Sequence, residues 1–135
     1  MTNCIFCKVV ANQIPSYTVY EDAQTRGFLD IFPTTDGAVM VIHKRHEEKI
    51  NGYTKKEIAV LFATVQKVAA GVEKAFATAI LTIGINHGEP AGVHHLHVHV
   101  IPRFVGDGGG IIQSLPNRKP KETLETVKEK IKGVL

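Results

Sequence analysis

The chain has 135 residues, of which 44% are hydrophobic and 21% charged, and this length and composition are typical of a single globular domain. The formal net charge of +3 comes without a dense basic stripe or any tryptophan, which argues against a nucleic-acid partner and allows a small anionic substrate. No apolar run approaches the roughly 20 residues that span a bilayer, and the N-terminal residues lack the pattern of a secretion signal, so we expect a cytoplasmic protein with no membrane partner.

Short elements are expected in the first third of the chain. Residues 4–11, which precede Pro15, have room for one or two helical turns. Three β-like runs separated by turn residues follow at 18–21, 26–31 and 38–43.

The strongest secondary-structure signal lies at 55–76. Its apolar residues recur at i, i+3, i+4 and i+7, which predicts a helix with one buried stripe. Thr54 is expected to be the N-cap, with Glu57 at the capping-box position three residues later. We therefore expect a long core helix here.

The remaining elements complete an α+β pattern. Strands are expected at 81–86 and 95–101, followed by a glycine-rich turn at 106–110 and a second helix at about 122–132. The strands do not alternate regularly with helices. Residues 1–135 are therefore predicted to form one α+β domain, with a five-stranded, largely antiparallel sheet, one long core helix and shorter terminal helices.

The two cysteines, Cys4 and Cys7, form a C-x-x-C pair. In a reducing cytoplasm this spacing indicates metal or redox chemistry more often than a structural disulfide. A metal site, two free buried thiols and a redox pair are the alternatives, although no thioredoxin-like pattern surrounds the pair.

The stretch HHLHVHVIPR at 94–103 holds four of the seven histidines. His95, His97 and His99 recur at every second position, and the residues between them are apolar. On a strand these three side chains would share one face, about 6.6 Å apart. Because imidazole titrates near neutral pH, the row predicts a nucleophile, a proton-transfer group and an orienting or metal-binding group. The alternatives are a solvated, histidine-rich strand and a purely structural metal site.

The segment 95–101 has the pattern His-φ-His-φ-His-φ-φ, where φ is apolar. This pattern resembles the signature of the histidine triad (HIT) family of nucleotide hydrolases and transferases. Four further motifs that resemble the family occur in the expected order, and the likeness spans about residues 4–103. They are CIFCKVV (4–10), FLDIFP (28–33), VMVIHKRH (39–46) and INHGEPAG (85–92).

The resemblance implies chemistry at the α-phosphate of a nucleotide. His97, the central histidine, would attack phosphorus and form a nucleotidyl-histidine that water then hydrolyses. His99 would contact the phosphate and help to protonate the leaving group. Splitting one displacement into two easier ones is the usual gain from covalent catalysis. We expect a backbone carbonyl to set the tautomer of His97.

The resemblance also implies a binding site for a purine nucleotide of the AMP type. Asp30 would accept hydrogen bonds from the ribose hydroxyls, and Asn86 would contact the phosphate or the leaving group. The apolar residues that would sandwich the base are Ile5, Phe6, Val9 and Ile31. By residue type alone, these four would be core residues, and the two polar residues would belong to turns or strand ends.

In the bacterial-type branch of the family, the resemblance implies a structural Zn²⁺ held by Cys4, Cys7, His46 and His95. A Cys₂His₂ set is a normal closed tetrahedral site. The ion would tie the N-terminus to the catalytic strand, and His95 would position the nucleophile rather than react itself. His43, where this branch commonly has proline, is a rival ligand to His46.

The loop before the histidines departs from the family pattern. The family usually has a Gly-Gln-Ser/Thr stretch that cradles the phosphate, whereas only Val93 and His94 separate Gly92 from His95 here. Backbone N–H groups of the shortened loop could still bind the anion, and His94 could replace the missing hydroxyl. The glycine run at 106–110 is flexible enough to approach a substrate, but such runs are weak evidence.

The resemblance implies a HIT-type hydrolase that releases a nucleoside monophosphate from purine nucleoside phosphoramidates, adenylyl conjugates or dinucleoside polyphosphates, and it implies no redox cofactor. The resemblance implies a homodimer to which the helix 55–76 and the adjoining strand contribute. One alternative is a zinc-stabilised nucleotide-binding module with weak or no catalysis, which the shortened loop favours. The other is a metalloenzyme whose catalytic metal is bound by His95, His97 and His99.

Overall fold

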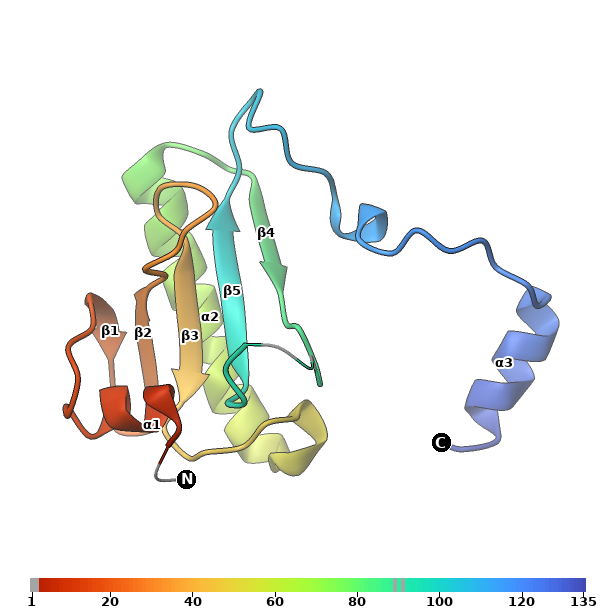
Figure 1. Cartoon of the computed structure of the whole chain (residues 1–135), viewed down its shortest axis with the longest axis horizontal. Coiled ribbons are helices and arrows are strands. Elements are labelled where there is room, and N and C mark those ends of the chain that lie inside the picture. Colours follow the sequence, from red (N-terminus) through yellow and green to blue (C-terminus); the bar gives the residue numbers. More distant parts are fainter. Residues whose placement is uncertain (1–2, 89, 91) are drawn as a thin grey trace.

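The structure is a computed structural model that describes residues 3–88, 90 and 92–135. Five strands form one sheet in the order β1-β2-β3-β5-β4, and every pair of neighbours is antiparallel. The α+β fold with a largely antiparallel sheet is therefore confirmed (Figure 1). In chain order the elements are α1 (Ile5–Val10), β1 (Thr18–Glu21), β2 (Thr25–Leu29), β3 (Val39–His43), the 3₁₀ turn η1 (Ile50–Gly52), α2 (Lys55–Phe76), β4 (Leu81–Gly84), β5 (His97–Pro102), the 3₁₀ turn η2 (Ile112–Ser114) and α3 (Leu124–Lys132).

The two faces of the sheet are covered by different helices. The long helix α2 packs across one face, and the short helix α1 lies at the end of the sheet where β3 finishes and β5 begins (Figure 1). Alternate residues of a strand point to opposite faces, and all five residues of β3 are buried. The α2 side of the core contains Val39, Val41, Leu61, Val65, Val68, Val72, Leu96, Val98 and Val100. The α1 side contains Phe6, Val9, Phe28, Met40 and Ile42.

Helix α2 has the predicted bounds and the predicted capping box. The hydroxyl of Thr54 accepts a hydrogen bond from the backbone N–H of Glu57 at 3.3 Å, and the Glu57 carboxylate accepts one from the backbone N–H of Thr54 at 2.8 Å. Arg45 also donates to this carboxylate, and that hydrogen bond is the main reason why the pKa of Glu57 falls to about 2.

The cap leads to a stability prediction. Thr54→Ala should lower the free energy of unfolding by about 1 kcal/mol, because one backbone N–H at the start of α2 loses its acceptor. Urea denaturation followed by circular dichroism measures the change. Thr54→Ser is the matched control, since serine keeps the hydroxyl, and its unfolding midpoint should stay near that of the wild type. Equal losses in both variants would contradict the capping role.

The strands are generally shorter than predicted, and one difference affects the site. Strand β5 begins at His97, whereas the predicted strand began at residue 95. The chain turns just before it, because His95 N–H donates to the carbonyl of Val93 at 2.8 Å and Leu96 N–H donates to Glu47 at 2.7 Å. His95 therefore lies in the turn, and only His97 and His99 share a face of the strand.

The C-terminal residues form an extended arm. Every residue from 104 to 135 is exposed, and α3, predicted at about 122–132, lies well away from the sheet and from α2 (Figure 1). Among the described residues, no helix has the length and apolar character needed to cross a membrane.

Candidate functional site

Two cysteines and two histidines lie together at the α1 end of the sheet. Cys4 and Cys7 come from α1 and its N-cap, His46 from the segment after β3, and His95 from the turn before β5. Their four ligand atoms lie within 4.8 Å of one another. The Cys7 sulfur is 3.3 Å from Nδ1 of His46 and 3.7 Å from Nδ1 of His95, and the Cys4 sulfur is 3.6 Å from the same His95 nitrogen.

These distances suit a tetrahedral metal ion. With Zn–S of about 2.3 Å and Zn–N of about 2.0–2.1 Å, tetrahedral geometry puts sulfur and nitrogen ligands about 3.6 Å apart. Nε2 of His95 lies 2.8 Å from the carbonyl oxygen of His43. Since a carbonyl only accepts, Nε2 carries the proton, and the lone pair is on Nδ1, which faces both cysteines. Burial lowers the pKa of His95 to about 4, so the ring is neutral at pH 7 and suited to bind a metal ion.

His43 does not belong to this cluster. Its side chain is buried on the α2 side of the sheet, where its ring contacts that of Tyr53. Its Nδ1 accepts the backbone N–H of Arg45 at 3.0 Å, and burial lowers its pKa. Of the two rivals named from the sequence, His46 is the one that lies among the cysteines.

His97 is held in one tautomer by the main chain. Its Nδ1 donates to the carbonyl oxygen of His95 at 2.7 Å, so the lone pair of the neutral ring is on Nε2. The side chain is buried and makes a T-shaped contact with Phe6, whose ring centroid is 5.2 Å away. The ring of His99 follows at 4.8 Å on the same face of β5. Two imidazole rings are thus side by side, and the tautomer of the first places its lone pair on Nε2.

A cavity of about 360 Å³ opens beside His99. Asp30, from the end of β2, and Asn86, from the end of β4, line it together with this histidine. The carboxylate of Asp30 accepts the backbone N–H of Phe32 at 2.9 Å, which orients the side chain. The structure therefore brings three of the polar residues named from the sequence to one cavity.

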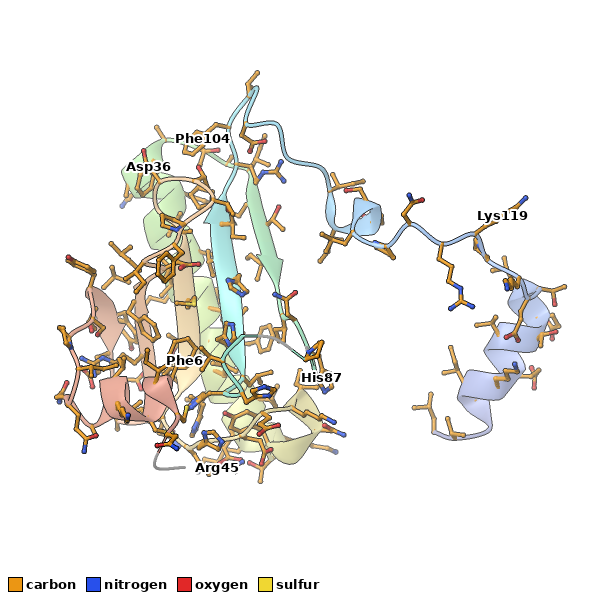
Figure 2. The ribbon with its side chains drawn as sticks, in the orientation of Figure 1. Phe6, Asp36, Arg45, His87, Phe104 and Lys119 are labelled. Atoms are coloured by element: carbon orange, nitrogen blue, oxygen red, sulfur yellow. The ribbon has the colours of Figure 1, made fainter. Side chains whose placement is uncertain are left out.

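The four apolar residues named for the base do not line this cavity. Phe6 and Val9 are buried in the core under α1, whereas Ile5 is 46% exposed and Ile31 is 63% exposed. Figure 2 shows Phe6 lying over the sheet near the α1 end. In this structure, two of the four are core residues and two are on the surface.

One wall of the cavity, which sequence reasoning missed, comes from the segment 110–115 and consists of Gly110, Ile111, Ile112, Ser114 and Leu115. Arg103 holds this wall in place: it donates to the carbonyl oxygen of Gly110 at 2.7 Å and to the hydroxyl of Thr82 at 3.1 Å. Arg103 also makes a two-fold contact with Asp107, whose pKa it lowers strongly. Arg103 therefore holds the glycine run at Asp107 and at Gly110, and the signal in the sequence was an arginine and an aspartate four residues apart.

The shortened loop lies on the other side of the site. His94 is exposed and lines a surface hollow with Cys4, His46 and Glu48, beside the cysteine–histidine cluster. Its Nδ1 is 3.8 Å from the Glu48 carboxylate. The structure does not bring His94 to the cavity of His99. Two residues of the INHGEPAG motif, at 89 and 91, lie outside the described residues.

Comparisons with known proteins decide the family. The model of the HIT domain family matches residues 11–106, which is more than half of the chain. The chain belongs to the HIT family. This HIT protein is 42% identical over 113 residues to Protein hit of Bacillus subtilis (strain 168), covering 82% of this chain and 78% of that relative.

Solved structures of HIT proteins have the same fold. A crystal structure of a HIT family member from Bacillus subtilis matches with a TM-score of 0.86 at 35% identity, covering 98% of this chain and 97% of that chain. A zinc-bound histidine triad family protein from Mycobacterium smegmatis matches with a TM-score of 0.73 at 27% identity and covers 99% of each chain. The cysteine–histidine cluster of this HIT protein could hold a metal ion, and that neighbour carries zinc.

Proposed function

We propose that this HIT protein hydrolyses purine nucleotides at the α-phosphate through a nucleotidyl-His97 intermediate. Its substrates would be purine nucleoside phosphoramidates, adenylyl conjugates or dinucleoside polyphosphates. The single observation that carries the proposal is the hydrogen bond from His97 Nδ1 to the main chain, which in the neutral ring places the lone pair on Nε2, beside a second imidazole. Family membership supports a nucleotide ligand in general.

In the first step, the Nε2 lone pair of His97 forms a bond to phosphorus while the bond between phosphorus and the leaving group breaks. The leaving group takes up a proton, and His99 is placed to guide that transfer. In the second step, water attacks phosphorus, the N–P bond breaks and the nucleoside monophosphate leaves, while the water gives up a proton that replaces the one taken up by the leaving group. The His97 lone pair is restored, so no net change remains on the protein.

The cavity residues would hold the nucleotide. Asp30 would accept the ribose hydroxyls, and Asn86 would donate to a phosphate or leaving-group oxygen, because both line the cavity that contains His99. The contacts with the base stay predictions, and they involve Ile5, Phe6, Val9 and Ile31.

The cysteine–histidine cluster would bind a structural Zn²⁺ through Cys4, Cys7, His46 and His95. The ion would supply a cross-link between α1 and the turn before β5. Phe6 of α1 contacts the ring of His97, so the position of α1 affects the packing around the proposed nucleophile. We also expect a homodimer in the cytoplasm, to which α2 contributes.

One experiment tests the enzyme against its rival. The protein is incubated with adenosine 5′-phosphoramidate, and the reaction is quenched within milliseconds to seconds. The mass of the intact protein is then measured by mass spectrometry, and the release of AMP is followed in a separate assay. We expect a transient nucleotidyl adduct and continuous release of AMP. Tight binding of AMP without an adduct or turnover would instead support the nucleotide-binding module, which the position of His94 outside the cavity favours.

The catalytic-metal alternative fits the geometry poorly. Nδ1 of His95 faces the cysteines and its Nε2 is bound to a carbonyl oxygen, so neither nitrogen is directed to a metal shared with His97 and His99.

The role of Asp30 leads to a further prediction. Asp30→Ala should raise KM for the phosphoramidate about 10- to 100-fold, because hydrogen bonds to a charged group contribute about 1.5–3 kcal/mol. Steady-state kinetics measure the change. Asp36→Ala, which removes an exposed carboxylate from the same connection between β2 and β3, is the matched control and should change KM less than two-fold. An equal KM in both variants would refute the ribose contact.

A further inference from the structure

A charged side chain lies among apolar residues on the α1 side of the sheet. Arg26 is the second residue of β2 and is 7% exposed. Alternate residues of a strand point to opposite faces, so Arg26 shares a face with Phe28, which belongs to the α1 side of the core. A buried charge is strongly unfavourable unless it is paired and hydrogen-bonded. The partners of Arg26 therefore show which parts of the fold it holds together.

The guanidinium of Arg26 binds the end of α1 on one side and β1 on the other. Its Nη1 donates to the carbonyl oxygen of Val9 at 2.6 Å and to Oδ1 of Asn12 at 3.0 Å. Its Nε donates to the hydroxyl of Thr18 at 3.0 Å and lies 3.7 Å from the carboxylate of Glu21. Arg26 therefore connects the C-terminal end of α1 to the two strands at one edge of the sheet.

Helix α1 depends on such contacts for its position. It has six residues, and isolated helices shorter than about 12–15 residues are marginal in water. Its N-cap residue, Cys4, makes no side-chain capping hydrogen bond. At the other end the chain leaves the helix through Asn12, whose backbone is left-handed with φ of 55°. An arginine near the C-terminus of a helix can bind the last carbonyl groups, and Arg26 does so at Val9.

The first turn of α1 carries residues of the candidate site. The ring of Phe6 makes a T-shaped contact with His97, with 5.2 Å between the centroids. The sulfur of Cys7 lies 3.3 Å from Nδ1 of His46. At a helical rise of about 1.5 Å per residue, both residues lie within roughly 5 Å of Val9 along the helix axis. A displacement of the anchored end of α1 therefore displaces both contacts.

Apolar packing alone does not fix α1 along its own axis. Phe6 and Val9 hold the helix against the sheet, but the burial of apolar surface has no directional preference. Hydrogen bonds weaken steeply when they are bent, so the bonds from Arg26 to Val9 and Asn12 specify where the end of α1 lies. The guanidinium is a rigid planar fork, and its contact with Thr18 of β1 fixes the orientation of that fork.

We propose that Arg26 is a positioning residue, which holds α1 in place and thereby sets Phe6 against His97 and Cys7 against His46. Among the described residues, its hydrogen bonds reach neither His97 nor the cysteine–histidine cluster, so it acts through α1. The inference rests on the proposed function, because the position of α1 matters for chemistry only if His97 reacts and the cysteines bind a metal ion.

Substitution of Arg26 in the full chain tests this role with two readouts. Competition with a chromophoric chelator gives the zinc affinity, and NMR with and without a chelator gives the nuclear Overhauser effect between the rings of Phe6 and His97. In Arg26→Met, which has no donor, we expect zinc to bind about 10-fold more weakly and the Overhauser effect to weaken, most clearly in the chelator-treated protein. Arg26→Lys keeps the charge and one donating group, so both values should lie between those of Arg26→Met and the wild type.

Two further variants separate positioning from general stability. Thr64→Val removes a buried hydroxyl that is hydrogen-bonded to Thr25 of β2 at 2.7 Å on the α2 side, so it should lower stability and leave both readouts at wild-type values. Asn12→Gly removes one acceptor of Arg26 at an exposed position, and glycine tolerates the left-handed backbone. It should weaken the Overhauser effect in the same direction as Arg26→Met, and it remains testable if Arg26→Met does not fold.

The Overhauser effect decides the role of Arg26. A wild-type value in Asn12→Gly and in folded Arg26→Met would overturn the proposal, and so would an equal weakening in Thr64→Val. Absence of zinc and of turnover in the wild type would instead refute the proposed function. The two failures are distinguishable, because the contact between the rings of Phe6 and His97 is measured without metal or substrate.

Discussion

Replacing His97 with alanine is expected to remove the nucleotidyl adduct entirely and to reduce AMP release from adenosine 5′-phosphoramidate by at least about 10³-fold. The reason is that the variant has no nitrogen to form the bond to phosphorus, and losses of this order or greater follow removal of a covalent nucleophile. Intact-mass analysis after rapid quenching detects the adduct, and steady-state assays give the loss in kcat.

Two controls separate a lost nucleophile from general damage. His87→Ala removes an exposed histidine from the connection between β4 and β5 and should keep the wild-type rate. The His97→Ala protein should still bind AMP, because Asp30 and Asn86, the residues proposed to contact the ribose and the phosphate, are unchanged. Turnover within ten-fold of the wild type in His97→Ala would contradict the covalent mechanism.

Replacing Cys7 with serine is expected to remove bound zinc and to lower the melting temperature by roughly 10 °C. The Cys7 sulfur contacts both histidines of the cluster, so the remaining residues form an open site with one ligand fewer. A loss of about 3 kcal/mol in a domain of this size gives a shift of this order. Metal analysis by mass spectrometry and thermal unfolding measure the two effects.

The metal dependence of that shift is the decisive part. A chelator should lower the melting temperature of the wild type toward that of Cys7→Ser and should leave the variant nearly unchanged. His94→Ala removes an exposed imidazole beside the cluster and should keep both the zinc and the melting temperature. A zinc content in Cys7→Ser equal to that of the wild type would rule out the site.

Some of the fold was predictable because local and tertiary preferences agree. In α2 the apolar stripe, the Thr54 cap and the Glu57 partner all favour the same helix, and its bounds match the prediction. The turn before β5 was not predictable, because alternation of His and apolar residues continues through His95 while the backbone already bends there. The periodicity of a sequence shows which residue types alternate, but it does not indicate where a hydrogen bond ends the strand.

The candidate site was predictable to a similar extent. The resemblance to the family named Asp30, Asn86 and His99, and the structure places all three on one cavity. It also named Phe6 for the base, which stays a prediction, and the structure shows this side chain buried in the same core cluster as Val9. Residue type alone cannot tell a core phenylalanine from a binding-site phenylalanine. The wall at 110–115 was missed because the Arg103–Asp107 spacing indicates an ion pair and does not indicate that Arg103 also binds the carbonyl oxygen of Gly110.

The hydrogen bond acceptor of His97 is a main-chain atom, and this has a consequence for how the protein can change. Any amino acid at position 95 offers the same carbonyl oxygen, provided that the backbone turn is kept. A change of the side chain at position 95 that keeps this turn therefore leaves in place the acceptor that sets the tautomer of His97. Loss of the proposed metal ligand and loss of this tautomer are separate events in substitution or in evolution, although one residue contributes to both.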